Sequence, residues 1–491
     1  MSEDSPPAKG LRGDSVGLLA TVALGLANVA PAYSIAVTLG LVTLVIGELA
    51  PSALLLGFVP VLLTAFAFRE LNREMPDCGT TFVWNTRVFG PVVGWVVGGW
   101  TLLSAAVVAL TALARVGAAA FLRLFGLDGP GTLAVTACAV LLLALATAIA
   151  YRGIQLAAYV QYLMIGLQLF ALLAFGVAAL VRNGAATVSL SWLNPFAVDG
   201  FGPFAEAVLL CLFIYWGWDA LITFNEESVD RTRTPGRAAL ISTVVLLVTY
   251  LFTAFATISF AGTGRTGRGL GDPDTAADVL TGLAPAVLGE LPARLVQLAI
   301  GVSAVGALLT CTAATPRTTL SMSAHGALPA AFARMHPRFR TPAFGTVFFG
   351  CAAAVVLTLL TLLTLLSADF LGDAVLSIGL LIAFYYGITG LACAWHFRRE
   401  LTDSLRNVLV KGVCPALGGL LMLAAFGRTA YDMADPSYGH TSLGGVGGVF
   451  LLGIGSILLG ALVMLCLVRP RHARFFREGR TAVAAVSVTE T

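Results

Sequence analysis

Apolar segments long enough to cross a membrane recur along the whole chain. A helix rises about 1.5 Å per residue, so about 20 apolar residues span a hydrocarbon core of about 30 Å. About twelve such segments can be counted, centred near residues 28, 59, 107, 141, 168, 214, 250, 305, 354, 384, 419 and 458. Because their length suits helices that satisfy their own backbone groups, they predict an all-α integral membrane protein with about twelve transmembrane helices.

The composition agrees with this fold class. Hydrophobic residues make up 58% of the chain and charged residues 11%, whereas soluble domains carry about 25% charged residues. We expect residues 1–13 to form a polar tail without a signal peptide and residues 14–468 to form the transmembrane domain. Residues 469–491 should form a basic tail whose arginines lie near anionic membrane lipids.

The distribution of basic residues predicts the orientation in the membrane. If the N-terminus is inside and every segment crosses, the inner side carries 22 of the 29 lysines and arginines and the outer side carries 6. Arg115 falls within a span, where it either extends towards the membrane surface or serves a transport pathway. Because cytoplasmic loops are enriched in lysine and arginine, we expect a plasma-membrane protein with both termini in the cytoplasm.

Patterns for a metal or nucleotide site are missing from the sequence. The eight cysteines include no CxxC pair, and the five histidines show no HExxH spacing. Residues 262–267 match GxGxxG, but no strand is predicted before them, as a dinucleotide site requires. We therefore expect no metal, no cofactor, no nucleic-acid partner and no enzymatic activity.

The first span contains a predicted helix break. Asn28 and Pro31 lie near its middle, and proline is favoured in the first turn of a helix because it lacks an N–H group. A second half-helix starting at Pro31 would direct the amides of Ala32, Tyr33 and Ser34 into the break. Such a helix N-terminus favours a carboxylate ligand. A simple proline kink is the alternative.

The sixth span contains a second predicted break, next to a carboxylate. Gly217 lies between two tryptophans, and Asp219 follows in the same apolar segment. A charge at membrane depth costs about 2.5–3.5 kcal/mol on insertion scales, so Asp219 needs a partner or a function. Interrupted helices at corresponding positions in two halves of a chain are typical of inverted-repeat secondary transporters, which bind substrate at the midplane.

Four stretches of the sequence resemble the amino acid–polyamine–organocation superfamily of amino acid permeases. They are residues 28–34, residues 74–94, residues 217–238 with Gly217-Trp218-Asp219 and Thr234-Pro235-Gly236, and residues 317–342. The resemblance implies a five-plus-five inverted repeat with helices 1 and 6 broken, followed by two extra helices.

The resemblance also implies a substrate site. Residues 30–34 match the segment that binds a substrate carboxylate, and the carbonyls of residues 215–218 match the segment that binds the amino group. Phe213 matches an aromatic gate, and Asp219 matches an acidic residue linked to proton sensitivity. The residues expected at the substrate are Asn28, Ala30, Pro31, Ala32, Tyr33, Ser34, Phe213, Tyr215, Trp216, Gly217, Trp218 and Asp219.

Candidates for ion coupling follow from the same resemblance. Some members hold a lysine in the fifth span, but the aligned position here is Gln168, which cannot change charge. Sodium could instead bind carbonyls near the first break together with Ser303 and Thr310, although such hydroxyls more often bond within their own helix. The candidates are therefore Asp219, Gln168, Ser303 and Thr310. Glu226 and Glu227, at the inner end of the sixth span, are expected to form ion pairs as gate or anchor residues.

Taken together, these features predict a secondary active transporter of amino acids that works by alternating access with proton symport. An amino acid exchanger and a polyamine or amine permease are alternatives, and in an amine carrier Asp219 would bind the second ammonium group. A sensor that binds substrate without transport is a further possibility. The expected partners are an amino acid or amine, a proton or sodium ion, and membrane lipids.

Overall fold

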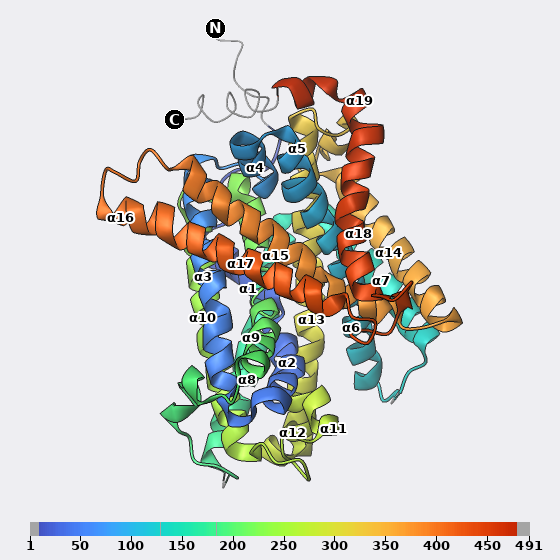
Figure 1. The fold of residues 1–491 in the computed structure, drawn as a ribbon. Coiled ribbons are helices and arrows are strands. Elements are labelled where there is room, and N and C mark those ends of the chain that lie inside the picture. Colours follow the sequence, from blue (N-terminus) through green and yellow to red (C-terminus); the bar gives the residue numbers. More distant parts are fainter. Residues whose placement is uncertain (1–8, 128, 183, 479–491) are drawn as a thin grey trace.

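The computed structural model describes residues 9–127, 129–182 and 184–478, which form a bundle of long helices (Figure 1). The long helices are α1 (Leu18–Val29), α2 (Pro31–Ile46), α3 (Ala50–Glu74), α6 (Leu102–Leu124), α7 (Thr132–Arg152), α8 (Ile154–Val181), α9 (Phe201–Phe213), α10 (Thr234–Ala261), α13 (Glu290–Ala324), α14 (Ala343–Leu366), α15 (Phe370–His396), α17 (Cys414–Met433) and α18 (Gly448–Val463).

Shorter elements connect or extend these helices. The short α-helices are α4 (Thr81–Phe89), α5 (Pro91–Val93), α11 (Pro273–Ala277), α12 (Val279–Leu288), α16 (Leu405–Asn407) and α19 (Arg469–Arg471). The 3₁₀ helices are η1 (Gly47–Leu49), η3 (Leu190–Leu193), η4 (Pro195–Ala197), η5 (Trp218–Glu227) and η6 (Ala330–Ala333), and the π-helices are η2 (Gly94–Thr101), η7 (Val408–Val413) and η8 (Met464–Val468). One antiparallel hairpin pairs β1 (Ser442–Leu443) with β2 (Val446–Gly447).

The predicted fold class is confirmed. Within the described residues, 11 helical segments are long and apolar enough to cross a membrane. One of them, Leu18–Glu74, has 57 residues and contains two of the predicted spans, because it is nearly three times the length that one crossing needs. All of the predicted span centres fall inside these segments. The inverted repeat itself stays a prediction.

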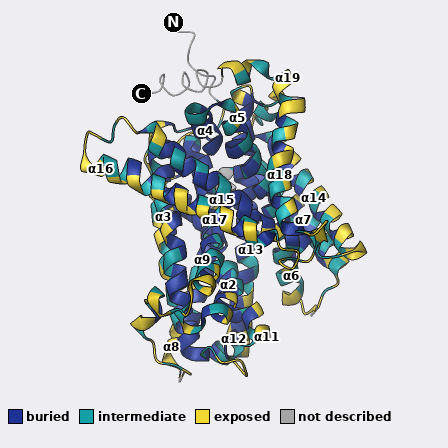
Figure 2. Ribbon diagram, viewed as in Figure 1, coloured by how far each residue is buried: buried dark blue, intermediate teal, exposed yellow. Residues whose placement is uncertain are grey.

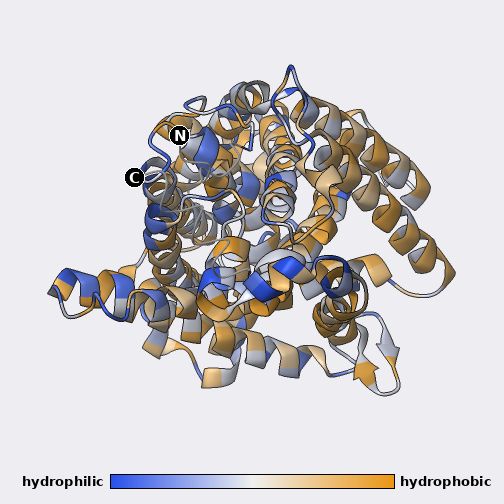
Figure 3. Cartoon of the chain, turned by 90° about the horizontal axis from the view of Figure 1, so that it is seen from above, coloured by the Kyte–Doolittle hydropathy of each residue, from blue (hydrophilic) through white to orange (hydrophobic). Residues whose placement is uncertain are grey.

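The outer faces of the bundle are apolar, as expected for helices that face lipid. Leu141 on α7, Leu163 on α8 and Val355 on α14 are 70%, 77% and 57% exposed. Buried residues concentrate in the centre of the bundle (Figure 2), and the view from above shows hydrophobic residues on its outer helices (Figure 3). In water such an apolar surface would drive aggregation, whereas a bilayer solvates it.

Both ends of the described chain lie at one end of the bundle, which we call the terminal face (Figure 1). Lys9 lies there, packed against the loop that follows α3 and the end of η5. Of the two predicted tails, residues 1–8 and 479–491 lie outside the described residues.

Candidate functional site

The first predicted helix break falls between α1 and α2. Ala30 separates them with φ 53° and ψ 60°, a left-handed conformation that costs a residue with a Cβ atom about 1–2 kcal/mol. Pro31 begins α2, as the sequence predicts. The Ser34 hydroxyl donates to the Val29 carbonyl (2.8 Å) across the break, and the Tyr33 amide points to Ser303 Oγ on α13 (3.4 Å).

The second predicted break separates α9 from η5. Gly217 has φ 112°, which glycine adopts without steric cost, and η5 begins at Trp218. The Asn28 side-chain amide donates to the Gly217 carbonyl (2.9 Å), so the two breaks contact each other. A Cβ atom at Gly217 would lie 2.8 Å from the Asn28 carbonyl oxygen, which leaves no room for a larger residue.

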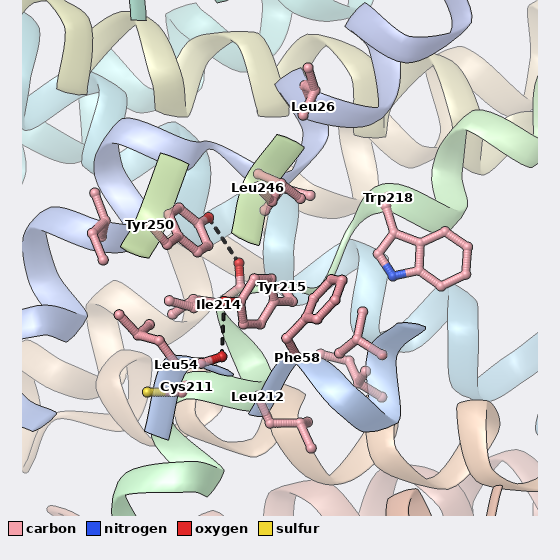
Figure 4. Packing of buried hydrophobic residues seen from close by; sticks show 14 of the residues in the cluster. Leu26, Leu54, Phe58, Cys211, Leu212, Ile214, Tyr215, Trp218, Leu246 and Tyr250 are labelled. Atoms are coloured by element: carbon pink, nitrogen blue, oxygen red, sulfur yellow. Dashed lines mark hydrogen bonds between the residues drawn. The ribbon is translucent and has the colours of Figure 1, made fainter. Parts of the chain in front are cut away.

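Two of the predicted substrate residues are anchored in the core. The Tyr215 hydroxyl donates to the Leu54 carbonyl (3.0 Å), and Tyr250 donates to the Ile214 carbonyl (3.1 Å), as Figure 4 shows. Trp218 is fully buried and its ring contacts the ring of Phe68 edge-on. These contacts hold both sides of the second break in place.

Other predicted residues are only partly covered. Half-buried side chains around the breaks belong to Asn28, Tyr33, Ser34, Phe213 and Trp216. They come from α1, α2 and α9 and from the turn after α9. Ala30, Pro31 and Ala32 are buried, and they can offer a ligand backbone groups only.

Asp219 has an uncharged partner. Its carboxylate accepts a hydrogen bond from the Tyr385 hydroxyl (2.9 Å), and that hydroxyl in turn accepts one from Trp216 Nε1 (2.8 Å). No lysine, arginine or histidine of the described residues forms an ion pair with Asp219. A buried carboxylate without a cation is costly when it is ionised.

Tyr385 was not among the predicted residues. It lies on α15, 166 positions from Asp219 in the sequence. The adjacent tyrosines Tyr385 and Tyr386 in an apolar span were a usable signal, because buried hydroxyl groups need hydrogen-bond partners. We call Asn28, Tyr33, Gly217, Asp219, Ser303 and Tyr385 the midspan site.

The predicted coupling residues separate into different environments. Ser303 lies beside the first break, whereas the Thr310 hydroxyl accepts a hydrogen bond from Gln161 Nε2 (2.9 Å). Gln161 was not predicted, and it also donates to the Gly306 carbonyl (2.6 Å). The buried Gln168 side chain has no hydrogen-bond partner for either polar atom within the described structure. Arg115 is half-buried on α6, and its role stays open.

A network of ion pairs lies at the terminal face. Lys9 Nζ lies 2.7 Å from Asp77 Oδ2 and 2.6 Å from Glu226 Oε1, and its side chain is only 8% exposed. His325 Nε2 lies 3.1 Å from Asp77 Oδ2. The Arg317 guanidinium donates hydrogen bonds to both carboxylate oxygens of Glu227, and the distance from Arg317 Nη2 to Glu227 Oε1 is 2.9 Å. We call Lys9, Asp77, Glu226, Glu227, Arg317 and His325 the terminal-face network.

Lys9 and Asp77 hold each other in their charged forms. Burial by itself would raise the pKa of Asp77, but the Lys9 ammonium and the hydrogen bond with His325 hold that pKa well below its usual range. Burial would likewise lower the pKa of Lys9, yet the carboxylates of Asp77 and Glu226 hold it above its ordinary value. These charges are therefore fixed around neutral pH.

Ion pairing of the two glutamates agrees with the prediction from sequence, whereas the ion pairs of Lys9, which belongs to the predicted N-terminal tail, were not predicted. Among the described residues, Asp77, Cys78 and Glu226 form the one group of side chains placed to share a metal ion. The Lys9 ammonium already lies within 2.6–3.7 Å of all three, so a metal would have to displace it.

Comparison with known proteins identifies the family. The model of a family described as amino acid permease matches residues 16–437. An uncharacterised transporter of Mycobacterium bovis is 28% identical over 62% of the chain, which spans 66% of the length of that relative, just under two thirds. A low-affinity putrescine importer of Escherichia coli is 24% identical over 82% of the chain and 86% of its own length. A branched-chain amino acid permease of Lactococcus lactis is 24% identical over 76% of the chain and 80% of its own length.

Proposed function

Because the chain belongs to the amino acid permease family, we propose that it transports amino acids or related amines across a membrane by alternating access. The observation that carries this proposal is the contact between the two helix breaks, from Asn28 to the Gly217 carbonyl. Non-helical backbone at membrane depth is tolerated where it lines a cavity, and paired breaks of this kind are where secondary transporters bind substrate.

The two breaks offer complementary groups to an amino acid. The start of α2 at Pro31 presents amides and a positive helix-dipole end, which favours the substrate carboxylate. The carbonyls of residues 215–216, freed where α9 ends, favour the ammonium group. In this proposal Tyr33, Phe213 and Trp216, all half-buried, surround the substrate side chain.

The proposed coupling ion is a proton, carried by Asp219. Its carboxylate is buried beside Tyr385, without a cation among the described residues, and a carboxyl in such a place can load and release a proton during transport. Asp219 is the second residue of η5 and Glu227 is the last, about 16 Å away at the 3₁₀ rise of about 2.0 Å per residue. A shift of η5 would therefore connect events at the midspan site with opening of the terminal-face network.

A second candidate substrate is a diamine, and the putrescine importer among the relatives favours it. In this alternative the ionised Asp219 binds the second ammonium group directly and no proton is needed there. For either substrate we propose the plasma membrane as the location and the terminal face as the cytoplasmic side, because that face carries the inner arginines of the predicted topology.

The test is uptake of radiolabelled amino acids and of putrescine into proteoliposomes, with and without an inward proton gradient. We expect the native protein to accumulate an amino acid when the gradient is present and Asp219→Asn to lose that stimulation while retaining substrate binding. Asp274→Asn, which alters an exposed carboxylate outside the site, is the matched control and should behave like the native protein.

Two other results would change the proposal. Equal uptake with and without the gradient, in both native protein and Asp219→Asn, would reject proton coupling and favour exchange. Uptake of putrescine alone, lost in Asp219→Asn together with binding, would establish the amine carrier.

A further inference from the structure

A strongly basic cavity opens at the terminal face, away from the midspan site. It has a volume of about 270 Å³ and lies between the end of α3, the start of α10 and the short helix α16, which projects from the upper left of the bundle in Figure 1. Its charged lining residues are Arg69, Glu70, Arg73, Arg233, Arg237 and Arg406. Five guanidinium groups thus face a single carboxylate.

Most of this positive charge is not neutralised by the protein. Arg69 is paired with Glu70 through two contacts of 2.6 and 2.9 Å to the same oxygen, and Arg233 lies 4.0 Å from Asp230. Arg73, Arg237 and Arg406 are exposed, and none of them has an ion pair with a described residue. Like charges this close repel one another, so an anion in the cavity would lower the energy of the folded protein.

The cavity is built on rigid elements. Gly236 packs against the Arg69 side chain, with no room for a Cβ atom, and this contact sets α10 directly against α3. The Asn72 side-chain amide donates to the Arg231 carbonyl (3.0 Å), which ties the loop before α10 to α3. The N-terminus of α10, a helix of 28 residues, adds its positive dipole end at the same place.

We propose that this cavity binds a phosphate group, in first place the headgroup of an anionic phospholipid. Arginine forks match the geometry of phosphate oxygens, and a helix N-terminus favours the same anion. A lipid is favoured because an apolar stripe follows Arg237 along one face of α10. It consists of Ile241, Val244 and Val248, at helical spacings of four, three and four residues from Arg237 onward. These side chains are 41%, 46% and 61% exposed and form an apolar track for acyl chains.

A soluble phosphorylated compound would offer the cavity the same phosphate group as a phospholipid. A binding experiment separates these two sources. Binding of fluorescent phosphatidylglycerol, of phosphatidylcholine and of inorganic phosphate is measured on the full-length protein purified in detergent. We expect phosphatidylglycerol to bind more tightly than phosphatidylcholine, with an affinity that falls as salt is added. Inorganic phosphate alone should neither bind measurably nor raise the Tm.

The decisive variant is Arg73→Gln/Arg237→Gln/Arg406→Gln. At about a fivefold loss per basic residue, the three substitutions together should lower phosphatidylglycerol affinity about a hundredfold. The matched control is Arg334→Gln/Arg338→Gln/Arg340→Gln, which removes three charges in the loop before α14, and it should bind like the native protein. Because all six residues are at or near the surface, both variants should elute as folded monodisperse protein, and the single variant Arg237→Gln provides a milder second test.

Each outcome bears on the proposal. Loss of binding in the cavity variant but not in the control supports a phospholipid site. A rise in Tm with inorganic phosphate, abolished only in the cavity variant, supports a phosphate site filled from solution. Equal losses in both triple variants, or unchanged binding in both, would overturn the proposal and leave only a general attraction between a basic face and anionic lipid.

Discussion

The carboxylates of the midspan site and of the terminal-face network differ in whether they have an ion-pair partner. At the midspan site Asp219 is buried beside the hydroxyl of Tyr385 and has no ion pair with a described residue. In the terminal-face network Asp77, Glu226 and Glu227 are all paired with basic side chains. A paired carboxylate keeps its charge and holds elements together, whereas an unpaired buried one can change its charge as its surroundings change.

The two kinds of carboxylate lie at opposite ends of one element, η5. η5 carries Asp219 at its start and Glu226 and Glu227 at its end. In the proposed mechanism, a change of charge or of ligand at the start of η5 would disturb the ion pairs at its end, and these pairs would break when the terminal face opens. Substitutions at four positions, two in the terminal-face network and two in the membrane-spanning core, test whether the two regions differ in this way.

Arg317→Gln should produce the largest loss of stability. It leaves Glu227 buried and without its cation, and breaking a buried pair from one side costs about 3–5 kcal/mol. Thermal unfolding in detergent measures this loss. The double variant Glu227→Gln/Arg317→Gln should recover much of it because no unpaired charge remains, and no recovery would argue that the guanidinium acts through packing on Phe224.

Lys9→Ala should cost about 1–3 kcal/mol, because Asp77 and Glu226 lose a shared ammonium partner. The lowered pKa of Asp77 means that its contribution is present above the unfolded value near 4 and is lost as pH falls through the folded value. The raised pKa of Lys9 means that its contribution is present below the unfolded value near 10 and is lost only as pH rises through the folded value.

The difference in Tm between native protein and Lys9→Ala should therefore be constant from about pH 5 to pH 9 and shrink only outside that window. Lys9→Arg, which retains the charge, is the control. A difference that disappears between pH 5 and pH 9 would contradict the assignment of the effect to the Lys9–Asp77 pair.

Tyr385→Phe should reduce the rate of uptake about tenfold with a smaller effect on stability. It removes the hydrogen bond to Asp219 and leaves Trp216 Nε1 without its acceptor, and a hydrogen bond to a charged group is worth about 1.5–3 kcal/mol. Initial rates in proteoliposomes measure the effect. Tyr438→Phe, near the hairpin, is the control, and equal rates in native protein and Tyr385→Phe would remove Tyr385 from the site.

Gln168→Leu should have the smallest effect, within about 1 kcal/mol of native stability, and uptake should persist. Both polar atoms of Gln168 are buried without a partner, and replacing such a group by an apolar one of similar size is close to neutral. Gln161→Leu is the contrast, since it removes two hydrogen bonds to α13. Complete loss of uptake in Gln168→Leu would return Gln168 to the coupling mechanism.

The sequence by itself determined the spans and the helix breaks. Twenty apolar residues dictate a crossing wherever they lie, and Pro31 and Gly217 interrupt a helix through their own backbone chemistry. The sequence also indicated that Glu226 and Glu227 form ion pairs, because they lie next to basic loops. Their individual partners could not be assigned from the sequence.

Only the tertiary structure decided which side chains meet. Tyr385 reaches Asp219 across 166 positions, Lys9 reaches Glu226 across 217, and Asn28 reaches Gly217 across 189. No local pattern encodes such contacts, because they depend on how close-packed helices are rotated and displaced against one another. The basic cavity arises in the same way, since its arginines lie on three separate segments that come together only in the folded bundle.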